Sequence, residues 1–190
     1  MTNYLVVGSS VGPEKRELVE ELVHRTQIET NTKLTFWETE ILNFIDDFRG
    51  RIGRVLTTSD NDYFKNKNIV LASAGPSLEG QIHDLRIHRE NFVVCTVSRA
   101  ARALISHGII PDIIFQVDAA ELDYKFYEGL DLSKTVLLSS TGTSTKITSL
   151  PFAEKFFFDV NQTLAIEMNK LCDIEVLAGF GGSVAGQGLG

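Results

Sequence analysis

The chain has 190 residues, of which 43% are hydrophobic and 23% charged, the balance of a globular protein with one full domain or a domain and part of another. A formal net charge of −7 argues against non-specific nucleic-acid binding, which needs a basic surface, although main-chain amides can hold a phosphate within an acidic protein. No apolar run reaches the roughly 18 residues of a membrane-spanning helix, and the N-terminus lacks a signal-peptide pattern, so we expect a cytoplasmic protein.

Two isolated cysteines and four histidines bear on redox state and metal binding. Cys95 and Cys172 have no CxxC partner and lie in apolar surroundings, so we expect free, buried thiols, with a disulfide as the minor alternative. No histidine follows a predicted strand, and no pair has the spacing of a metal site. We therefore expect structural or surface histidines and no metal ligands.

Residues 1–67 are predicted to form a smaller α/β or helical region that ends in a linker. In chain order we expect a strand over 4–7, a helix over 14–27, a second helix with one broad buried face over 36–48, and a polar linker over 57–67. The glycine loop 8–12 lacks the Gly-Lys-Ser/Thr ending of a Walker motif and the third glycine of a dinucleotide fingerprint. It is interpreted as an ordinary strand–helix turn.

From residue 68 strands and helices alternate regularly. We expect strands over 69–74, 92–97, 113–117, 135–139, 155–160 and 174–177, and helices over 77–88, 99–107 and 162–171. Gly108 stands where a left-handed residue closes a helix. Strands that alternate with helices of this length form βαβ units with right-handed crossovers. The sequence therefore predicts an α/β fold over residues 68–190, with a Rossmann-like, doubly wound and mostly parallel sheet.

The most informative part of the chain follows the first of these strands, at residues 74–78 (Ala-Gly-Pro-Ser-Leu). The apolar run 69–72 predicts a strand covered on both faces. Gly75 can adopt the backbone angles of a sharp turn and lets a ligand approach the main chain. Pro76 suits a first helical position, where free amides face an incoming anion such as a nucleotide phosphate. Similar turns also occur in many α/β proteins that bind nothing there.

Small and polar residues follow the other predicted strands as well. They are Thr96, Ser98 and Arg99; Asp118, Glu121 and Asp123; the run 139–145, which includes Ser140, Thr141 and Gly142; and the run 179–183. Ligands of parallel α/β sheets collect at the carboxyl ends of strands, where such residues let the backbone wrap a polar molecule. Each residue alone has a structural explanation, since Ser and Thr after a strand commonly cap the next helix. Their recurrence at five strand ends favours a ligand site.

Three motifs then occur in order: 74–78, then 108–112 (Gly-Ile-Ile-Pro-Asp) followed by Asp118, then 181–185 (Gly-Gly-Ser-Val-Ala). Together they resemble the family that joins the motility-associated factor proteins of flagellin glycosylation to archaeal 6-hydroxymethylpterin diphosphokinase-like proteins. The resemblance covers about residues 66–190 and carries nothing over to the residues before them.

The core of that family also resembles bacterial sialyltransferases, in which a Gly-Pro-Ser-Leu turn lies against a CMP-sugar donor. The resemblance implies transfer of a nonulosonic acid, of the sialic, pseudaminic or legionaminic type, from this nucleotide-sugar to Ser or Thr hydroxyls of flagellin, without a tightly bound cofactor. It implies nucleotide contacts at Gly75, Pro76, Ser77, Leu78, Ser98, Ser140, Thr141, Gly142, Gly181, Gly182 and Ser183. Asp118 is the first candidate for the base or for a carboxylate that orients the donor, with Glu121 and Asp123 behind it.

Family members continue beyond the helix that begins near Ser183, so we expect this chain to be a C-terminally incomplete member whose activity does not follow from the family alone. A second function stays open. It is pyrophosphoryl transfer from ATP to a hydroxymethyl pterin, with Mg²⁺ held by Asp118, Glu121 and Asp123.

A third function, from a different class, is that of a non-catalytic scaffold. An exposed apolar patch from Phe152, Phe156 and Phe157 would favour it. The run 156–158 is better explained as part of a buried strand, and metal dependence or loss of nucleotide affinity would separate the three functions.

Overall fold

The computed structural model describes residues 13–50, 53–56, 60 and 64–158. The chain divides into two compact units, Met1–Glu38 and Thr39–Gly190, and the second contains the sheet. Several predicted features lie outside the described residues: the strand over 4–7, the loop 8–12, the helix over 162–171, the strand over 174–177, Cys172, and the motif with Gly181, Gly182 and Ser183.

One long helix, α1 (Pro13–Gly50), takes the place of the two helices predicted over 14–27 and 36–48. The prediction of two helices is wrong because nothing inside α1 breaks a helix: neither glycine nor proline occurs between its first and last residues. Proline is tolerated in a first turn and glycine ends helices, which explains both boundaries. No helix among the described residues, α1 included, is apolar enough over a sufficient length to span a membrane.

The broad buried face expected for residues 36–48 is only partly formed. Trp37 and Leu42 are 41% and 54% exposed, whereas Ile41 is half-buried. The most buried side chain of this part of α1, among those described, is the carboxylate Asp47, which is 5% exposed. The helix therefore packs through a polar residue that the apolar pattern does not reveal.

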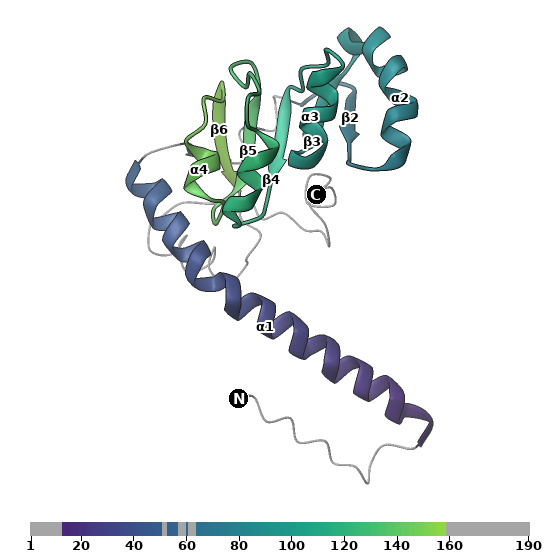
Figure 1. Cartoon of the computed structure of the whole chain (residues 1–190), viewed down its shortest axis with the longest axis vertical. Helices are drawn as coiled ribbons and strands as arrows, with labels where there is room; N and C mark the ends of the chain where they lie inside the picture. Colours follow the sequence, from purple (N-terminus) through teal and green to yellow (C-terminus); the bar gives the residue numbers. More distant parts are fainter. Residues whose placement is uncertain (1–12, 51–52, 57–59, 61–63, 159–190) are drawn as a thin grey trace. The chain divides into compact units, whose positions relative to one another are not determined.

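Six parallel strands form one sheet (Figure 1). They are β1 (Arg54–Val55), β2 (Ile69–Ala72), β3 (Val93–Val97), β4 (Ile113–Gln116), β5 (Val136–Ser140) and β6 (Glu154–Phe158). Their order across the sheet is β1-β6-β5-β4-β3-β2, and every neighbouring pair is parallel. The five predicted strands that lie in the described part are confirmed, and so is the α/β, Rossmann-like fold.

The helices between the strands agree with the predicted alternation. They are α2 (Pro76–Ile87), α3 (Ser98–Ser106) and α4 (Thr145–Thr148), with the short 3₁₀ helices η2 (Arg89–Asn91) and η3 (Glu121–Phe126). The helices predicted over 77–88 and 99–107 are confirmed. The sequence does not predict α4 and η3, because one or two turns carry too little periodicity to stand out.

The end of α3 shows how one glycine closes a helix. Gly108 has φ +79°, and its N–H donates to the carbonyl of Ile105 at 2.9 Å. The next N–H, of Ile109, donates to the carbonyl of Leu104 at 3.0 Å. This pair of bonds is a Schellman motif, and it brings Ile109 into contact with the apolar cluster that contains Leu104. The predicted left-handed C-cap is confirmed.

From β2 to β6 the chain advances by one strand at a time in the same direction. Because parallel crossovers are right-handed, the connecting helices then cover one face of the sheet. On this face the helix residues Ile82, Ala101, Leu104 and Ile147 join the strand residues Val94, Ile114 and Leu137 in two buried clusters. These clusters fix the helices on the sheet and so fix the strand-end loops that lead into them.

The opposite face is apolar too. Its buried cluster is Cys95, Ile113, Phe115, Leu138 and Phe158. Leu56 and Phe64, from the connection between β1 and β2, pack against it. Burial, with the nearby charge of Asp112 as the smaller cause, raises the pKa of the free Cys95 thiol to about 11, which confirms the predicted buried cysteine.

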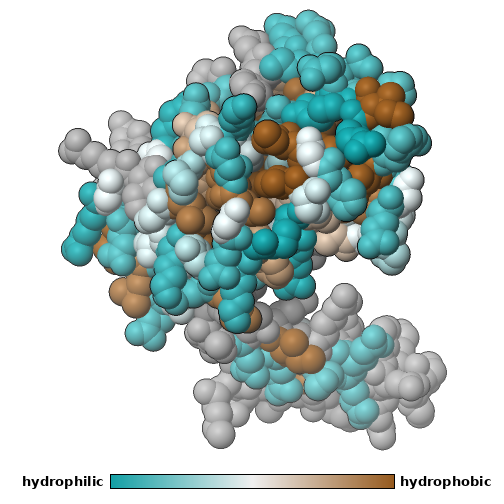
Figure 2. Space-filling view, turned by 45° about the horizontal axis from the view of Figure 1, so that its top comes forward, coloured by the Kyte–Doolittle hydropathy of each residue, from teal (hydrophilic) through white to brown (hydrophobic). Residues whose placement is uncertain are grey.

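β2 lies at one edge of the described sheet, with β3 as its neighbour. The prediction that 69–72 is covered on both faces is wrong, since Ile69 is 49% exposed and Ala72 alone is buried in this strand. Figure 2 shows apolar side chains between hydrophilic ones on one face of the molecule. The division after residue 67 remains a prediction, while the compact units divide after Glu38 and place β1 with the later strands.

Candidate functional site

The carboxyl ends of parallel strands meet at one edge of a sheet, where ligands of such folds bind. The described residues include four of the five strand-end loops that the sequence predicts to hold a ligand. They are the turn after β2, the start of α3 after β3, and the loops after β4 and β5. These four differ in exposure and in what covers them.

The turn after β2 is open. Gly75 is the N-cap of α2, and Pro76 begins the helix as predicted. The angles of Gly75, φ −139° and ψ 162°, are extended backbone that any residue adopts, so the expectation of a special turn conformation is wrong. Among the described residues, a Cβ added there would meet only the Oγ of Ser77, at 3.9 Å. Neither backbone strain nor packing against this part of the chain calls for a glycine here, and these residues leave space beside it for a ligand.

A pocket of about 280 Å³ lies along this turn and the edge of β2. Ser73, Ser77 and Gln81 give it a polar side, while Leu71 and Leu78 belong to its apolar side. Ligand pockets commonly begin at about 300 Å³, so this one suits a small group such as a base or a ribose phosphate. It contains three of the predicted nucleotide contacts.

At the start of α3, the predicted nucleotide contact Ser98 is buried, whereas the next residue, Arg99, is exposed to solvent. Ser98 is 5% exposed, and its hydroxyl lies near the buried side chain of Tyr127. Arg99 is exposed, with its guanidinium carbon 5.4 Å from the centre of the Phe126 ring and its charge close to Asp118. An exposed guanidinium beside a strand end is well placed to bind an anion.

After β4, Asp118 is exposed, and its carboxyl group lies near Asp123. Partial desolvation raises the pKa of Asp118, and the charge of Asp123 adds to this rise, while Arg99 opposes it. Glu121 does not join them: its side chain is 63% exposed and pairs with the Nζ of Lys146 at 2.6 Å. The structure therefore brings together two of the three predicted acidic residues.

Asp123 is the inner member of this pair, at 7% exposure. Its Oδ2 accepts a hydrogen bond from Nε2 of Gln116 at 3.1 Å, and the same nitrogen donates to the main-chain oxygen of Asp118 at 3.2 Å. The hydroxyl of Tyr127 donates to Oε1 of Gln116 at 2.8 Å. Sequence reasoning missed Gln116 and Tyr127, although a glutamine at the end of an apolar strand is a signal for a buried polar contact.

The loop after β5 is closed from within. Ser140, Thr141 and Gly142 are all buried. The Oγ of Ser140 donates to the main-chain oxygen of Val117 at 2.8 Å and lies 3.2 Å from the Oγ1 of Thr143. These hydroxyls satisfy the loop itself, so the structure does not bring this strand end together with the open turn at Gly75.

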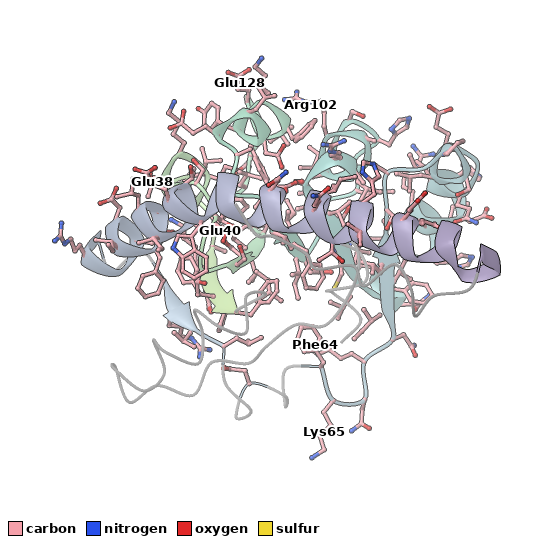
Figure 3. The ribbon with its side chains drawn as sticks, turned by 90° about the horizontal axis from the view of Figure 1, so that it is seen from below. Glu38, Glu40, Phe64, Lys65, Arg102 and Glu128 are labelled. Carbon is pink, nitrogen blue, oxygen red and sulfur yellow. The ribbon has the colours of Figure 1, made fainter. Side chains whose placement is uncertain are left out.

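Residues of α1 cover this loop. A Cβ on Gly142 would lie 2.8 Å from the Cγ and 3.0 Å from the Cβ of Glu40, which Figure 3 labels. The Nδ2 of Asn43 donates to the oxygen of Gly142 at 2.9 Å and lies 3.4 Å from the oxygen of Ala119. Asn43 thus joins the loops after β4 and β5. Sequence reasoning missed these residues because nothing in the motifs extends to α1.

The sequence of residues 47–189 matches the signature of a family described as 6-hydroxymethylpterin diphosphokinase MptE-like. The chain belongs to this family. The resemblance drawn from the three motifs is therefore confirmed.

The MptE-like chain also has the fold of a solved structure, the MAf glycosyltransferase from Magnetospirillum magneticum AMB-1. The two share 16% sequence identity with a TM-score of 0.53, over 65% of this chain and 21% of that one. The MptE-like chain thus matches about a fifth of the length of that protein. No curated protein matches the sequence.

The MptE-like match begins at Asp47, which holds α1 to α4. Its Oδ1 accepts a hydrogen bond from the Oγ1 of Thr148 at 2.6 Å, and its Oδ2 has no hydrogen-bond partner among the described residues. Burial raises the pKa of Asp47 to about 6, although the bond from Thr148 and the charge of Lys155 act in the other direction. Burial likewise lowers the pKa of Lys155. The contact between α1 and the MptE-like sheet unit therefore depends on a buried, titratable group.

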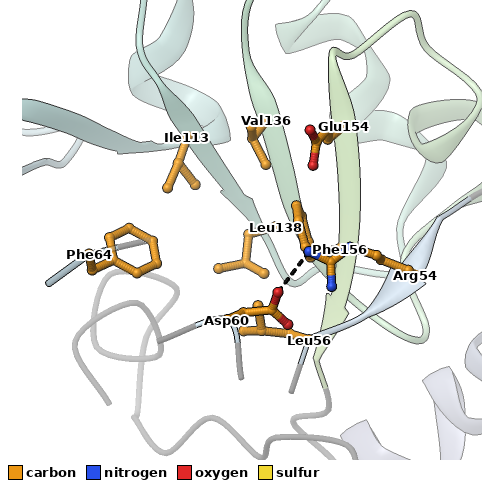
Figure 4. A pocket seen from close by; sticks show the side chains of 9 residues that line it. All are labelled: Arg54, Leu56, Asp60, Phe64, Ile113, Val136, Leu138, Glu154 and Phe156. Carbon is orange, nitrogen blue, oxygen red and sulfur yellow. Dashed lines mark hydrogen bonds and ion pairs between the residues drawn. The ribbon is translucent and has the colours of Figure 1, made fainter. Parts of the chain in front are cut away.

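A second pocket, of about 190 Å³, lies on the other face of the sheet (Figure 4). Ile113 and Val136, which begin β4 and β5, form part of its floor. Arg54 lies 4.0 Å above the centre of the Phe156 ring and pairs with Asp60 at 2.7 Å. Because this pocket lies at the amino-terminal ends of the strands, it is separate from the strand-end site.

Proposed function

We propose that the strand-end site binds a CMP-activated nonulosonic acid and that the sugar is transferred, in the cytoplasm, to Ser or Thr hydroxyls of a flagellin. The observation that carries this proposal is the exposed Gly-Pro-Ser-Leu turn at 75–78, with open space beside its glycine and a pocket of about 280 Å³ along it. Membership of the MptE-like family and the fold shared with a MAf glycosyltransferase support it.

The chain offers two kinds of group for the donor nucleotide. The N–H of Ser77 in the first turn of α2 suits a phosphate, because Pro76 has no N–H and that of Leu78 donates to the oxygen of Gly75 at 3.0 Å. Arg99 adds an exposed cation. The direct contacts we propose are Gly75, Pro76, Ser77 and Leu78. Ser98, Ser140, Thr141 and Gly142 are buried and bonded or packed within the protein, so we assign them to the walls of the site.

Transfer joins the acceptor oxygen to the anomeric carbon while the bond from that carbon to the phosphate oxygen of CMP breaks. The electron pair of the broken bond leaves with CMP, and the hydroxyl proton passes to a base. Asp118 is the base we propose, because it is an exposed carboxyl group at the same edge of the sheet. Arg99 is close enough to influence its charge.

Thermal unfolding with added CMP, CTP, ATP, or ATP with Mg²⁺ tests the proposal. A ligand at about 100 times its Kd adds roughly 2.7 kcal/mol, which raises the Tm of a protein of this size by several degrees. We expect stabilisation by CMP and CTP without metal. Gly75→Ser should abolish it, because the new side chain enters the open space, while Gly80→Ala, at an open position within α2, should retain it. Absence of any CMP effect on the unaltered chain would contradict the proposal.

A second candidate, pyrophosphoryl transfer from ATP to a hydroxymethyl pterin, is favoured by the description of the family itself. The Mg²⁺ site that this reaction needs does not fit the three acidic residues, since Glu121 pairs with Lys146 while Asp123 is bonded to Gln116. Within the described ranges no group of three or more His, Cys, Asp or Glu side chains could hold a metal ion. Stabilisation by ATP only when Mg²⁺ is present would favour this candidate.

The scaffold alternative loses the feature that would favour it. Phe152, Phe156 and Phe157 form no exposed patch: Phe152 and Phe157 are each 8% exposed, and Phe156 is half-buried. The buried strand expected over 156–158 is confirmed as part of β6.

A further inference from the structure

The main chain that carries Asp118 is held by side-chain hydrogen bonds. Residues 117–120 follow β4, whose last paired residue is Gln116, and they form neither strand nor helix. Three consecutive main-chain oxygens, those of Val117, Asp118 and Ala119, each accept a hydrogen bond from a side chain. Loops are commonly the more mobile parts of a domain, and bonds of this kind counter that mobility.

Two of the donors are buried residues at the ends of neighbouring strands. Ser140, which ends β5 and is 2% exposed, donates its hydroxyl hydrogen to the oxygen of Val117 at 2.8 Å. Gln116, which ends β4 and is 1% exposed, donates through Nε2 to the oxygen of Asp118 at 3.2 Å. The hydroxyl of Tyr127 donates to Oε1 of Gln116 at 2.8 Å, which fixes the amide with its nitrogen toward this loop.

The third donor comes from α1. Nδ2 of Asn43 donates to the oxygen of Gly142 at 2.9 Å and makes a longer bond, of 3.4 Å, to the oxygen of Ala119. The bond between Asp47 and Thr148, at 2.6 Å, holds the same part of α1 on α4. Asn43 lies before the region that matches the family, residues 47–189, so the family signature does not include this donor.

The three bonds leave the Asp118 side chain itself open to solvent. Ala119 is 5% exposed and Val117 is half-buried, whereas Asp118 between them is exposed. With the main chain bonded before, at and after Asp118, its carboxyl group moves mainly by rotation about its own side-chain bonds. A reacting group that is fixed before a ligand arrives loses little freedom when the ligand binds.

We infer that Ser140, Gln116 and Asn43 are positioning residues for Asp118, because they hold the main chain from which its carboxyl group extends. A serine hydroxyl has one hydrogen, and Ser140 gives it to Val117, so this residue acts on the loop and not as a donor to a nucleotide. The role of Asp118 in transfer rests on the proposed function, whereas the rigidity of its main chain does not.

Backbone ¹⁵N relaxation of the unliganded chain tests the inference. In the unaltered chain we expect amide order parameters of about 0.85 at Asp118 and Ala120, the value of rigid main chain. Ser140→Ala frees the peptide group between Val117 and Asp118 and should lower the value at Asp118 to about 0.6 or less. Asn43→Ala frees the peptide group that follows Ala119 and should do the same at Ala120.

Each variant has a matched control. Ser139→Ala makes the same change at the preceding residue of β5, where the buried hydroxyl donates to the oxygen of Ser140 at 3.0 Å. Thr39→Ala lies at an exposed position of α1. Both should leave the order parameters of Asp118 and Ala120 unchanged.

Three results of these relaxation measurements would overturn the inference. They are a mobile loop in the unaltered chain, equal order parameters in the variants and the unaltered chain, and an equal loss of order in the controls. Should Ser140→Ala not fold, the difference between Asn43→Ala and Thr39→Ala decides alone.

Thermal unfolding with CMP separates this inference from the proposed function. Ser140→Ala should keep the stabilisation by CMP, because its lost bond holds Asp118 and not the turn at Gly75. Loss of that stabilisation with unchanged order parameters would make Ser140 a nucleotide contact and overturn the inference. Lower order parameters in a chain that CMP does not stabilise would support the positioning role and reject the proposed function. Where transfer can be measured, Ser140→Ala should lower kcat about tenfold or more with little change in KM.

Discussion

Two strand ends of the same sheet carry small residues and are used in opposite ways. Beside Gly75, after β2, an added Cβ would meet no described residue closer than 3.9 Å, whereas on Gly142, after β5, it would lie 2.8 Å from Glu40. One glycine leaves space for a molecule from outside, and the other leaves space for a helix of the same chain. The comparison teaches that a glycine at a strand end marks a close approach without saying what approaches.

The closed strand end, after β5, is held to α1 by polar contacts. Asn43 and Asp47 of α1 are bonded to Gly142 and Thr148, and the Asp47 carboxylate is buried. The open end has no such contact with α1 among the described residues. Two of its amides are bonded within the turn, Gly75 to the oxygen of Ser73 and Leu78 to that of Gly75, so Ser77 supplies the N–H that remains available. The difference can be tested by disturbing each end in turn.

Of the changes proposed here, the titration of Asp47, at the closed strand end after β5, should change the free energy of unfolding most. Its pKa is raised from 3.8 to about 6 in the folded protein, so between these values the folded state binds more protons than the unfolded chain. Its contribution is therefore complete below about pH 4 and is lost as pH rises through about 6. We expect the stability of the unaltered chain relative to Asp47→Asn to fall by up to about 3 kcal/mol over this window.

Urea unfolding of both proteins at several pH values measures this difference. Asp46→Asn, at the exposed neighbouring position, should retain most of the pH dependence. Parallel stability profiles for the unaltered chain and Asp47→Asn would show that Asp47 does not titrate within the closed end.

Gly142→Ala should have the next largest effect, because the new methyl group would overlap side-chain and main-chain atoms of α1 at Glu40. Overpacking of this kind costs about 1–3 kcal/mol. The free energy of unfolding in urea measures it. Gly80→Ala, which meets no atom within 4 Å in α2, is the matched control and should be stabilising by roughly 0.5–1 kcal/mol. A Gly142→Ala protein as stable as the unaltered chain would mean that α1 does not hold this loop.

Gly75→Ser should have the smallest effect on the unliganded protein. The extended angles of Gly75 suit serine, which is also a better N-cap, so we expect a change within about 0.5 kcal/mol. Thermal unfolding without ligand measures it. A loss as large as that of Gly142→Ala would show that the turn at β2 is packed like the loop at β5, and the comparison would fail.

The parts of the fold that could be predicted depend on local patterns. The alternation from β2 to β6 and the closure of α3 at Gly108 are confirmed, because apolar periodicity and a left-handed glycine act within a few residues. The single helix α1 was missed because helices were expected over 14–27 and 36–48 alone, although no residue between these ranges breaks a helix. Absence of a pattern is weaker evidence than the presence of a glycine or proline.

The candidate site likewise has residues that the sequence predicts and residues that it does not. The Gly-Pro-Ser-Leu turn and Asp118 were found from the sequence because each follows a strand. The bonds of Gln116 to Asp123 and Tyr127 depend on how η3 and the residue after it lie against the end of β4. No spacing rule gives such a contact, and none indicates that α1 covers Gly142.

The bonds that close the β5 loop join residues far apart in the sequence: 99 positions separate Asn43 from Gly142, and 101 separate Asp47 from Thr148. During synthesis α1 is therefore complete long before the loop and helix that it contacts have been made. Contacts of such long range also form late in folding, since the chain must first close a large loop. Until then Asn43 and Asp47 are exposed to water, which solvates them well. The polar residues that hold α1 to the folded sheet are thus also well solvated before the loop after β5 and α4 have formed.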